Sequence, residues 1–101
     1  MLIKIGIIRI DMLSLGEISE RLAKLNSWAL EGNSLVKDRT CANFKGAIEF
    51  VNKVAELAEK HNHHPSVIID NNIVRLSLTT VYEKGLTQKD FELASDIEKI
   101  T

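Results

Sequence analysis

Pro65, the only proline in this chain of 101 residues, constrains the fold more than any other residue. Proline lacks a backbone N–H and clashes with the preceding helical turn, and it pushes the residue before it towards extended geometry. The segment before it, FKGAIEFVNKVAELAEKHN, has apolar residues at helical spacing, whereas the segment after it alternates as a strand does. A helix must therefore end and a strand begin close to Pro65. All three histidines of the chain lie at this junction: His61, His63 and His64.

Three helices are predicted from capping residues and apolar spacing. The helix before Pro65 should begin after Asn43, a favourable N-cap. Its core-facing stripe is expected to comprise Phe44, Ile48, Val51, Ala55 and Ala58, widened by Ala47 and Val54. An earlier helix follows the capping-box pair Ser14 and Glu17, carries Leu15, Ile18, Leu22 and Leu25, and should end near Asn26. The last helix follows a similar pair, Thr87 and Asp90, and should bury some of Phe91, Leu93, Ala94, Ile97 and Ile100.

Two β-hairpins are predicted between these helices. In SWALEGNSLVKDRTCA the turn pair Gly32-Asn33 separates two extended runs, and Asp70-Asn71-Asn72 joins SVIID to IVRLSLTTVY. In the last of these runs apolar and polar residues alternate, so one face should be buried and the other polar. The buried set is Val74, Leu76 and Leu78, and the polar set is Arg75, Ser77 and Thr79, with Val81 in the same parity as the polar set.

The fold class predicted is therefore α+β, with an antiparallel sheet of two hairpins and three helices on one face. The order is (β)αββαββα, in which the first, bracketed strand spans about residues 2–10 because Ile3, Ile5 and Ile7 alternate with Lys4 and Gly6. This extra strand is expected to be an edge strand or an interface element. The whole chain, residues 1–101, is expected to form one domain.

Composition excludes several function classes. Hydrophobic residues make up 45% and charged residues 27%, as in a globular protein, and the net charge of −1 shows no electrostatic footprint for nucleic acid or an anionic membrane. The most apolar stretch, MLIKIGIIRI, is too short and too charged to span a bilayer and lacks the features of a signal peptide. The single cysteine, Cys41, excludes an internal disulfide and fits a reducing compartment, so a cytoplasmic location is expected.

Three interpretations of the histidine cluster compete. It can be a solvated helix terminus, where the helix dipole favours imidazolium. It can be a metal site, since His61 and His64 have feasible spacing, but the chain offers no further histidine and no second cysteine to complete it. It can also supply acid–base chemistry, because histidine titrates near neutral pH.

The motifs around the cluster favour the third interpretation. AEKHNHHP, the extended hairpin after it, LSLTT, and then GLTQKDFELASDIE together resemble the pterin-4a-carbinolamine dehydratase family. The resemblance runs from about Leu13 to the end of the chain and includes Trp28 and the long helix before the histidines. It implies the dehydration of a 4a-hydroxytetrahydropterin to the quinonoid dihydropterin, without metal or other cofactor.

The resemblance also implies roles for six residues. His63 would act as general acid or base, His64 would hold the pterin, and Asp90 would support the site electrostatically, although Asp90 fits a helix-capping role equally well. The substrate-binding residues would be Glu59, Thr79 and Thr80.

Two departures from the family keep a second function open. Val81 stands where the family usually carries a third histidine, and the strand after Pro65 lacks the expected aromatic residue. These changes predict a slower or stereochemically altered enzyme, or a catalytically weakened module that binds pterin or promotes protein dimerisation. His61 is an additional histidine outside the family pattern. Relatives form dimers and tetramers, so a homodimer or homotetramer is expected, with no direct nucleic-acid or membrane partner.

Overall fold

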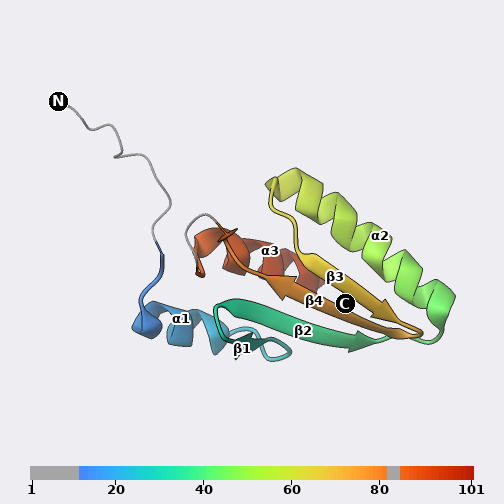
Figure 1. Ribbon diagram of the computed structural model, residues 1–101, viewed down its shortest axis with the longest axis horizontal. Helices are drawn as coiled ribbons and strands as arrows, with labels where there is room; N and C mark the ends of the chain where they lie inside the picture. Colours follow the sequence, from blue (N-terminus) through green and yellow to red (C-terminus); the bar gives the residue numbers. More distant parts are fainter. Residues whose placement is uncertain (1–11, 82–84) are drawn as a thin grey trace.

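A computed structural model describes residues 12–81 and 85–101 of the chain. Within these ranges lie three helices and four strands, in the predicted order αββαββα (Figure 1). The helices are α1 (Leu15–Leu22), α2 (Phe44–His61) and α3 (Gln88–Lys99), and the strands are β1 (Ala29–Glu31), β2 (Ser34–Thr40), β3 (Ser66–Asp70) and β4 (Ile73–Leu78). The α+β prediction is confirmed, whereas the strand predicted at about 2–10 lies outside the described residues.

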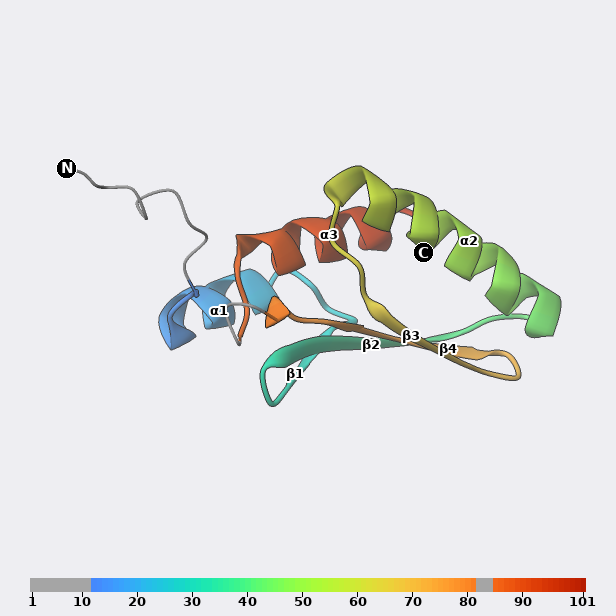
Figure 2. The same ribbon diagram turned by 45° about the horizontal axis from the view of Figure 1, so that its top comes forward.

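The four strands form one antiparallel sheet in the order β1-β2-β4-β3. Each predicted hairpin is present, and the two hairpins join through β2 and β4, which pair from Leu35 with Leu78 to Thr40 with Ile73. The turn residues Gly32 and Asn71 have φ of 58° and 56°, a conformation that glycine and asparagine tolerate best. The helices cover one face of this sheet, as Figure 2 shows.

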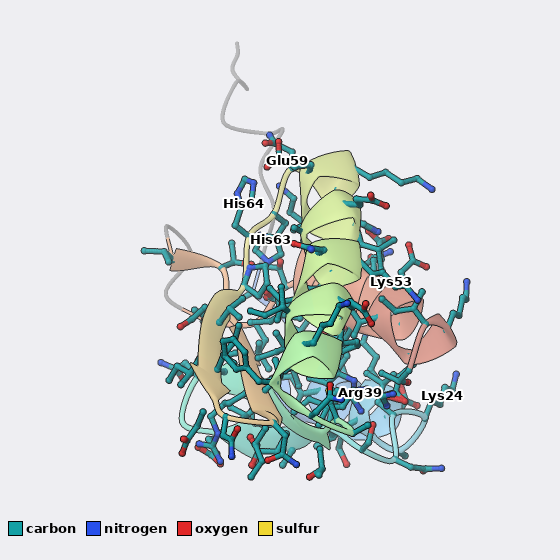
Figure 3. All side chains as sticks on the ribbon, turned by 90° about the vertical axis from the view of Figure 1, so that its right-hand side faces the viewer. Lys24, Arg39, Lys53, Glu59, His63 and His64 are labelled. Atoms are coloured by element: carbon teal, nitrogen blue, oxygen red, sulfur yellow. The ribbon has the colours of Figure 1, made fainter. Side chains whose placement is uncertain are left out.

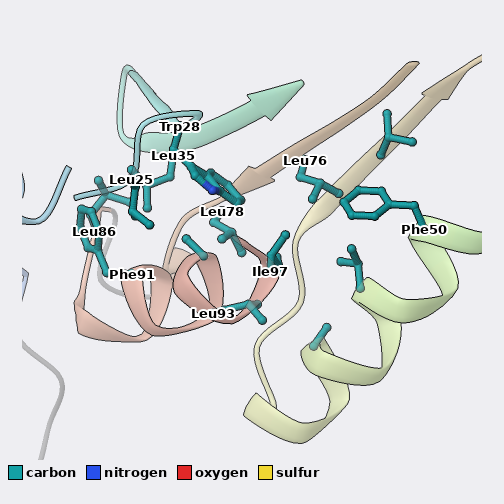
Figure 4. Close-up of a cluster of buried hydrophobic side chains, with 14 of the residues drawn as sticks. Leu25, Trp28, Leu35, Phe50, Leu76, Leu78, Leu86, Phe91, Leu93 and Ile97 are labelled. Atoms are coloured by element: carbon teal, nitrogen blue, oxygen red, sulfur yellow. The ribbon is translucent and has the colours of Figure 1, made fainter. Parts of the chain in front are cut away.

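The core lies between the sheet and helices α2 and α3 (Figure 4). Strand β4 supplies its alternate residues as predicted, and α3 supplies a buried face that packs against both hairpins. Among the least exposed of these side chains are Leu35, Val74, Leu76, Leu78, Leu93 and Ile97. Because α3 rests on both hairpins, its position fixes the residues at its N-terminus relative to the sheet.

A buried lysine contributes a polar cluster beside this core. Lys37, on the helix-facing side of β2, is 5% exposed and donates hydrogen bonds to Ser27 Oγ (2.6 Å) and Glu98 Oε1 (3.0 Å). The same carboxylate oxygen accepts from Trp28 Nε1 at 3.0 Å and from the Ser27 hydroxyl. Burial raises the pKa of Glu98, but these donors outweigh it and lower the pKa below its usual value. The positive charge of Lys37 is therefore balanced by the carboxylate of Glu98.

The structure differs from prediction in three places. Helix α1 ends at Leu22 rather than near Asn26, because the chain turns there and carries Leu25 and Trp28 into the core. Strand β4 ends at Leu78, before the predicted TTVY. The core face of α2 consists of Ala47, Phe50, Val54 and Ala58, so the predicted stripe through Phe44 and Ala55 is wrong at those two positions, which are exposed.

In the described ranges, 12–81 and 85–101, no helix combines the length and apolar character needed to cross a bilayer.

Candidate active site at the end of α2

The junction before Pro65 depends on Asn62, which ends α2 in the left-handed conformation with φ 49° and ψ 44°. Asparagine enters this region more readily than most residues. The reversal lets the backbone N–H of His63 donate to the carbonyl of Ala58 at 3.0 Å, which closes the helix end. His63 and His64 then leave the helix in opposite environments, since His63 is buried and His64 is exposed.

A substitution at Asn62 tests this arrangement. Asn62→Val should lower the free energy of unfolding by about 1–2 kcal/mol, because a β-branched residue disfavours positive φ. Asn62→Gly is the matched control and should stay close to wild type, since glycine adopts this conformation freely. Urea denaturation of both variants measures the difference, and equal stability of the two would contradict the role assigned to the reversal.

His63 belongs to a buried hydrogen-bonded network. Its Nε2 lies 2.5 Å from Asp90 Oδ1, and the residue is 8% exposed. The other carboxylate oxygen, Oδ2, accepts from Thr80 Oγ1 at 2.8 Å and from the Thr87 backbone N–H at 2.9 Å, and the two threonine hydroxyls lie 2.8 Å apart. Asp90 thus caps α3, and its other carboxylate oxygen contacts a histidine. The contact with Asp90 engages Nε2 of His63, so Nδ1 is the ring nitrogen that this contact does not use.

His64 forms a second and separate pair. Its Nε2 lies 2.6 Å from Glu59 Oε2, and both side chains are largely exposed, at 60% and 77%. This pair stands at the rim of an open cleft of about 180 Å³ between α2 and β3. The cleft lining is mainly apolar and comprises Val51, Val54, Ala55, Ala58, Pro65 and Val67, beside Glu59 and His64. Figure 3 shows Glu59, His63 and His64 gathered at this end of α2.

His61 forms a third pair on a different side of the helix. Its Nε2 lies 2.7 Å from Asp96 Oδ2 of α3. The hydrogen bond from His61 lowers the pKa of Asp96 below its usual value, against the opposing effect of burial. His61 therefore ties α2 to α3, and of the three histidines only His64 lines the cleft.

The remaining predicted residues have different surroundings. The hydroxyl of Thr80 is committed to Asp90 and Thr87, and that of Thr79 donates to the carbonyl of Asn33 at 2.7 Å. Val81 is 76% exposed, at the position where the family would place a histidine.

Thr87 also belongs to this network, although the sequence predicts only a helix-capping role for it. The capping-box spacing to Asp90 was the available signal, because it placed the two residues in contact. Across residues 12–81 and 85–101 no group of three potential metal-ligating side chains converges. The three histidines instead each contact one carboxylate.

Comparisons with known proteins identify the family to which the chain is similar. The family model for pterin 4 alpha carbinolamine dehydratase matches residues 11–100. A candidate pterin-4-alpha-carbinolamine dehydratase of Chloroflexus aurantiacus is 51% identical over 88 residues, which cover 87% of this chain and 95% of the relative. A candidate of the same name from Trichodesmium erythraeum is 41% identical and covers 90% of this chain and 98% of its own length.

Solved structures show the same fold. The crystal structure of a transcriptional coactivator/pterin dehydratase from Brucella melitensis superposes with a TM-score of 0.84 at 29% identity, over 89% of this chain and 98% of that one. A pterin dehydratase-like RuBisCO assembly factor of the alpha-carboxysome has a TM-score of 0.58 at 15% identity, over 72% of this chain and 84% of that one. The second likeness concerns the fold alone.

Proposed function

The chain belongs to the pterin 4 alpha carbinolamine dehydratase family, and we propose that it dehydrates a 4a-hydroxytetrahydropterin by histidine acid–base chemistry. The observation that carries this proposal is the pairing of His63 with Asp90 and of His64 with Glu59 at one end of α2. A histidine oriented by a carboxylate is the usual arrangement for proton transfer near neutral pH.

The proposed reaction breaks the C4a–O bond. The hydroxyl group takes the bonding electrons and one proton from a general acid, and leaves as water. A ring nitrogen of the pterin supplies the electrons that expel it and loses a proton to a base, which yields the quinonoid dihydropterin. The reaction therefore needs one group that gives a proton and one that receives one, and a single histidine can do both in turn.

His63 is the residue proposed for this transfer. Asp90 accepts from Nε2, so Nδ1 is the nitrogen that would exchange the proton. The buried carboxylate would stabilise the imidazolium while the proton is held, as carboxylates do beside catalytic histidines. Thr80 and the Thr87 amide hold that carboxylate in place, so they would act as positioning residues. We therefore do not propose a contact between the Thr80 hydroxyl and the pterin, because this hydroxyl already bonds to Asp90 and lies beside the Thr87 hydroxyl.

His64 and Glu59 are proposed to bind the substrate. They combine exposed polar groups with the apolar cleft of about 180 Å³, a pattern typical of small-molecule sites. The cleft is smaller than the roughly 300–1,000 Å³ of enclosed ligand pockets. The apolar lining would therefore hold one side of the pterin, while Glu59 and His64 contact its polar edge. Thr79 is kept as a proposed contact through its backbone, because its hydroxyl is occupied.

The test is the dehydration rate of chemically generated 4a-hydroxytetrahydropterin with and without the protein. The wild-type protein should accelerate the reaction over buffer. His64→Ala should raise KM more than it lowers kcat, because the exposed side chain contributes binding, and its exposure leaves the fold unchanged. Glu59→Gln is the companion variant and should act in the same direction. A wild-type rate equal to that of buffer would exclude the dehydratase activity.

Val81 supports a second candidate, a module that binds pterin or a protein partner with little catalysis. The side chain is 76% exposed where the family histidine would supply another proton-transferring group. Pterin binding without acceleration of dehydration, measured on the same preparation, is the result expected of that module.

A further inference from the structure

A second cation lies on the helix-facing side of β2, two residues beyond Lys37. Leu35, Lys37 and Arg39 alternate on this side, and the Arg39 guanidinium carbon lies 5.0 Å from the centre of the Phe50 ring. Lys37 has Glu98 as its counterion. The Nε of Arg39 is buried and, within residues 12–81 and 85–101, has no hydrogen-bond partner. In the part of the chain that the structure describes, Arg39 therefore has no carboxylate partner comparable to the one Glu98 gives to Lys37.

The neighbouring carboxylate cannot supply that neutralisation. Asp38 points to the opposite side of β2, where it makes a bidentate contact with Arg75 at 2.8 and 2.9 Å. Arginine keeps its charge at every physiological pH, and a buried charged donor without an acceptor is unfavourable. A ligand acceptor beside Arg39 would relieve this cost.

The space for such a ligand is present. Arg39 lines an open cavity of about 230 Å³ between the end of β2, the first turns of α2 and the end of α3. Lys53 also lines it and, among the residues described here, forms no ion pair. Glu49 is the one carboxylate of the lining, and no ion pair joins it to either cation within those residues. Figure 3 shows Arg39 near the end of α2 opposite to His63 and His64, so this cavity is separate from the candidate active site.

We propose that this cavity binds a phosphate group, free or as part of a small molecule, through Arg39 and Lys53. The guanidinium fork matches two phosphate oxygens, and its carbon lies 5.0 Å from the centre of the Phe50 ring, a contact that helps to hold the side chain at the cavity. The lysine ammonium adds a second positive charge, which favours phosphate over a singly charged carboxylate. Glu49 opposes the bound anion and limits its affinity.

The part of the lining that follows Arg39 along the chain is tied to the turn between β3 and β4. The backbone N–H of Cys41 donates to the Asn72 carbonyl at 2.7 Å, and the Asn72 side chain returns a bond to the Cys41 carbonyl at 3.0 Å. The cavity is therefore built on backbone fixed by both hairpins. Binding would require a small adjustment of the Arg39 side chain to present Nε, and no rearrangement of the sheet.

The experiment is an NMR titration of the whole protein with sodium phosphate, following the arginine Nε–H signals, with sodium chloride at matched ionic strength as the blank. The Arg39 signal should shift to saturation with phosphate and not with chloride, while the signal of Arg75, already paired with Asp38, should stay in place. Sodium acetate should bind more weakly. An unmoved Arg39 signal, equal effects of chloride, or acetate binding as tight as phosphate would each overturn the proposal.

Variants separate binding from folding. Arg39→Gln should weaken phosphate binding by about tenfold or more, since a hydrogen bond to a charged group is lost. Lys53→Gln changes an exposed residue and should also weaken binding, whereas Glu49→Gln should tighten it because the repulsion is removed. If Arg39 had only a structural role, Lys53→Gln and Glu49→Gln would bind phosphate with the affinity of the wild type. That result would refute the site. The dehydration rate should be unaffected in all three, so failure here leaves the proposed function untouched.

Discussion

His63→Ala should slow the dehydration of 4a-hydroxytetrahydropterin by about 10²–10⁴-fold in kcat, the usual contribution of a general acid or base. The physical reason is that the buried Asp90 contacts Nε2 of His63, so that Nδ1 is the ring nitrogen proposed to transfer the proton. The binding of substrate should change less than the rate, because His63 is 8% exposed and the exposed contacts belong to His64 and Glu59. Stopped-flow absorbance of the dehydration gives both parameters.

His61→Ala is the matched control for this experiment. It removes an imidazole from the same helix end and breaks an equivalent contact, the 2.7 Å pair with Asp96, but it leaves the cleft intact. Its kcat should remain close to wild type. Equal losses in the two variants would show that the effect comes from the helix end as a whole, and a His63→Ala rate equal to wild type would reject the assignment of the acid.

Asp90→Ala should lower the free energy of unfolding by about 3–5 kcal/mol, because several buried donors lose their acceptor and each such loss costs about 1–3 kcal/mol. Asp90 is 0% exposed and accepts three hydrogen bonds, from His63, Thr80 and the Thr87 amide. Alanine would remove the acceptor of all three bonds, and among the described residues only the Thr80 hydroxyl would keep another partner, the Thr87 hydroxyl. Equilibrium urea denaturation, with the m-value checked for two-state behaviour, measures the loss.

Asp90→Asn separates the structural from the chemical role of this side chain. The amide oxygen can keep the bonds from Thr80 and the Thr87 amide, but its NH₂ group would face His63 and require the other tautomer. We expect a smaller stability loss than for Asp90→Ala, with a large fall in kcat, as in other histidine–carboxylate pairs. Asp96→Asn is the control on the same helix. Asp96 is 28% exposed, so its loss of stability should stay within about 1 kcal/mol. Full activity of Asp90→Asn would contradict the proposed orientation of His63.

Much of the fold follows from local signals. Asn43 and Pro65 bracket α2, the pairs Gly32-Asn33 and Asn71-Asn72 mark the hairpin turns, and strand β4 alternates as expected. These features depend on backbone preferences of a few residues, which a sequence displays directly. The association of the two hairpins through β2 and β4 was implied only by the need for one sheet.

The orientation of α2 was less predictable. The helix carries two apolar rows at helical spacing, one through Ala47, Phe50 and Val54 and the other through Phe44 and Ala55. Periodicity alone does not distinguish them, because each satisfies the same spacing. The position of the sheet determines which row is buried. The row with Phe50 packs against Leu76 and the rest of the core, as Figure 4 shows, while Phe44 remains 55% exposed.

The site was predicted as a set of residues but not as an arrangement. The family pattern named His63, His64 and Asp90, and the structure places them in two carboxylate pairs, one buried and one exposed. Neighbouring residues of an extended chain point to opposite sides, which explains why two adjacent histidines have different partners. Their partners could not be read from spacing, since Asp90 comes from another helix and contacts His63 only through tertiary packing.

The pairing of the two hairpins through β2 and β4 has a consequence for the order of assembly. The two strands of each hairpin are close in the sequence. Strands β2 and β4, in contrast, are separated in the sequence by α2 and β3, so their pairing closes a long loop. Such non-local pairing is expected to be slow in the folding of a small domain. Helix α3 packs against both hairpins, so it can dock fully only after that closure. Asp90 belongs to α3, so we expect the His63–Asp90 contact to form only when α3 docks, and His63→Ala should then speed unfolding more than it slows folding.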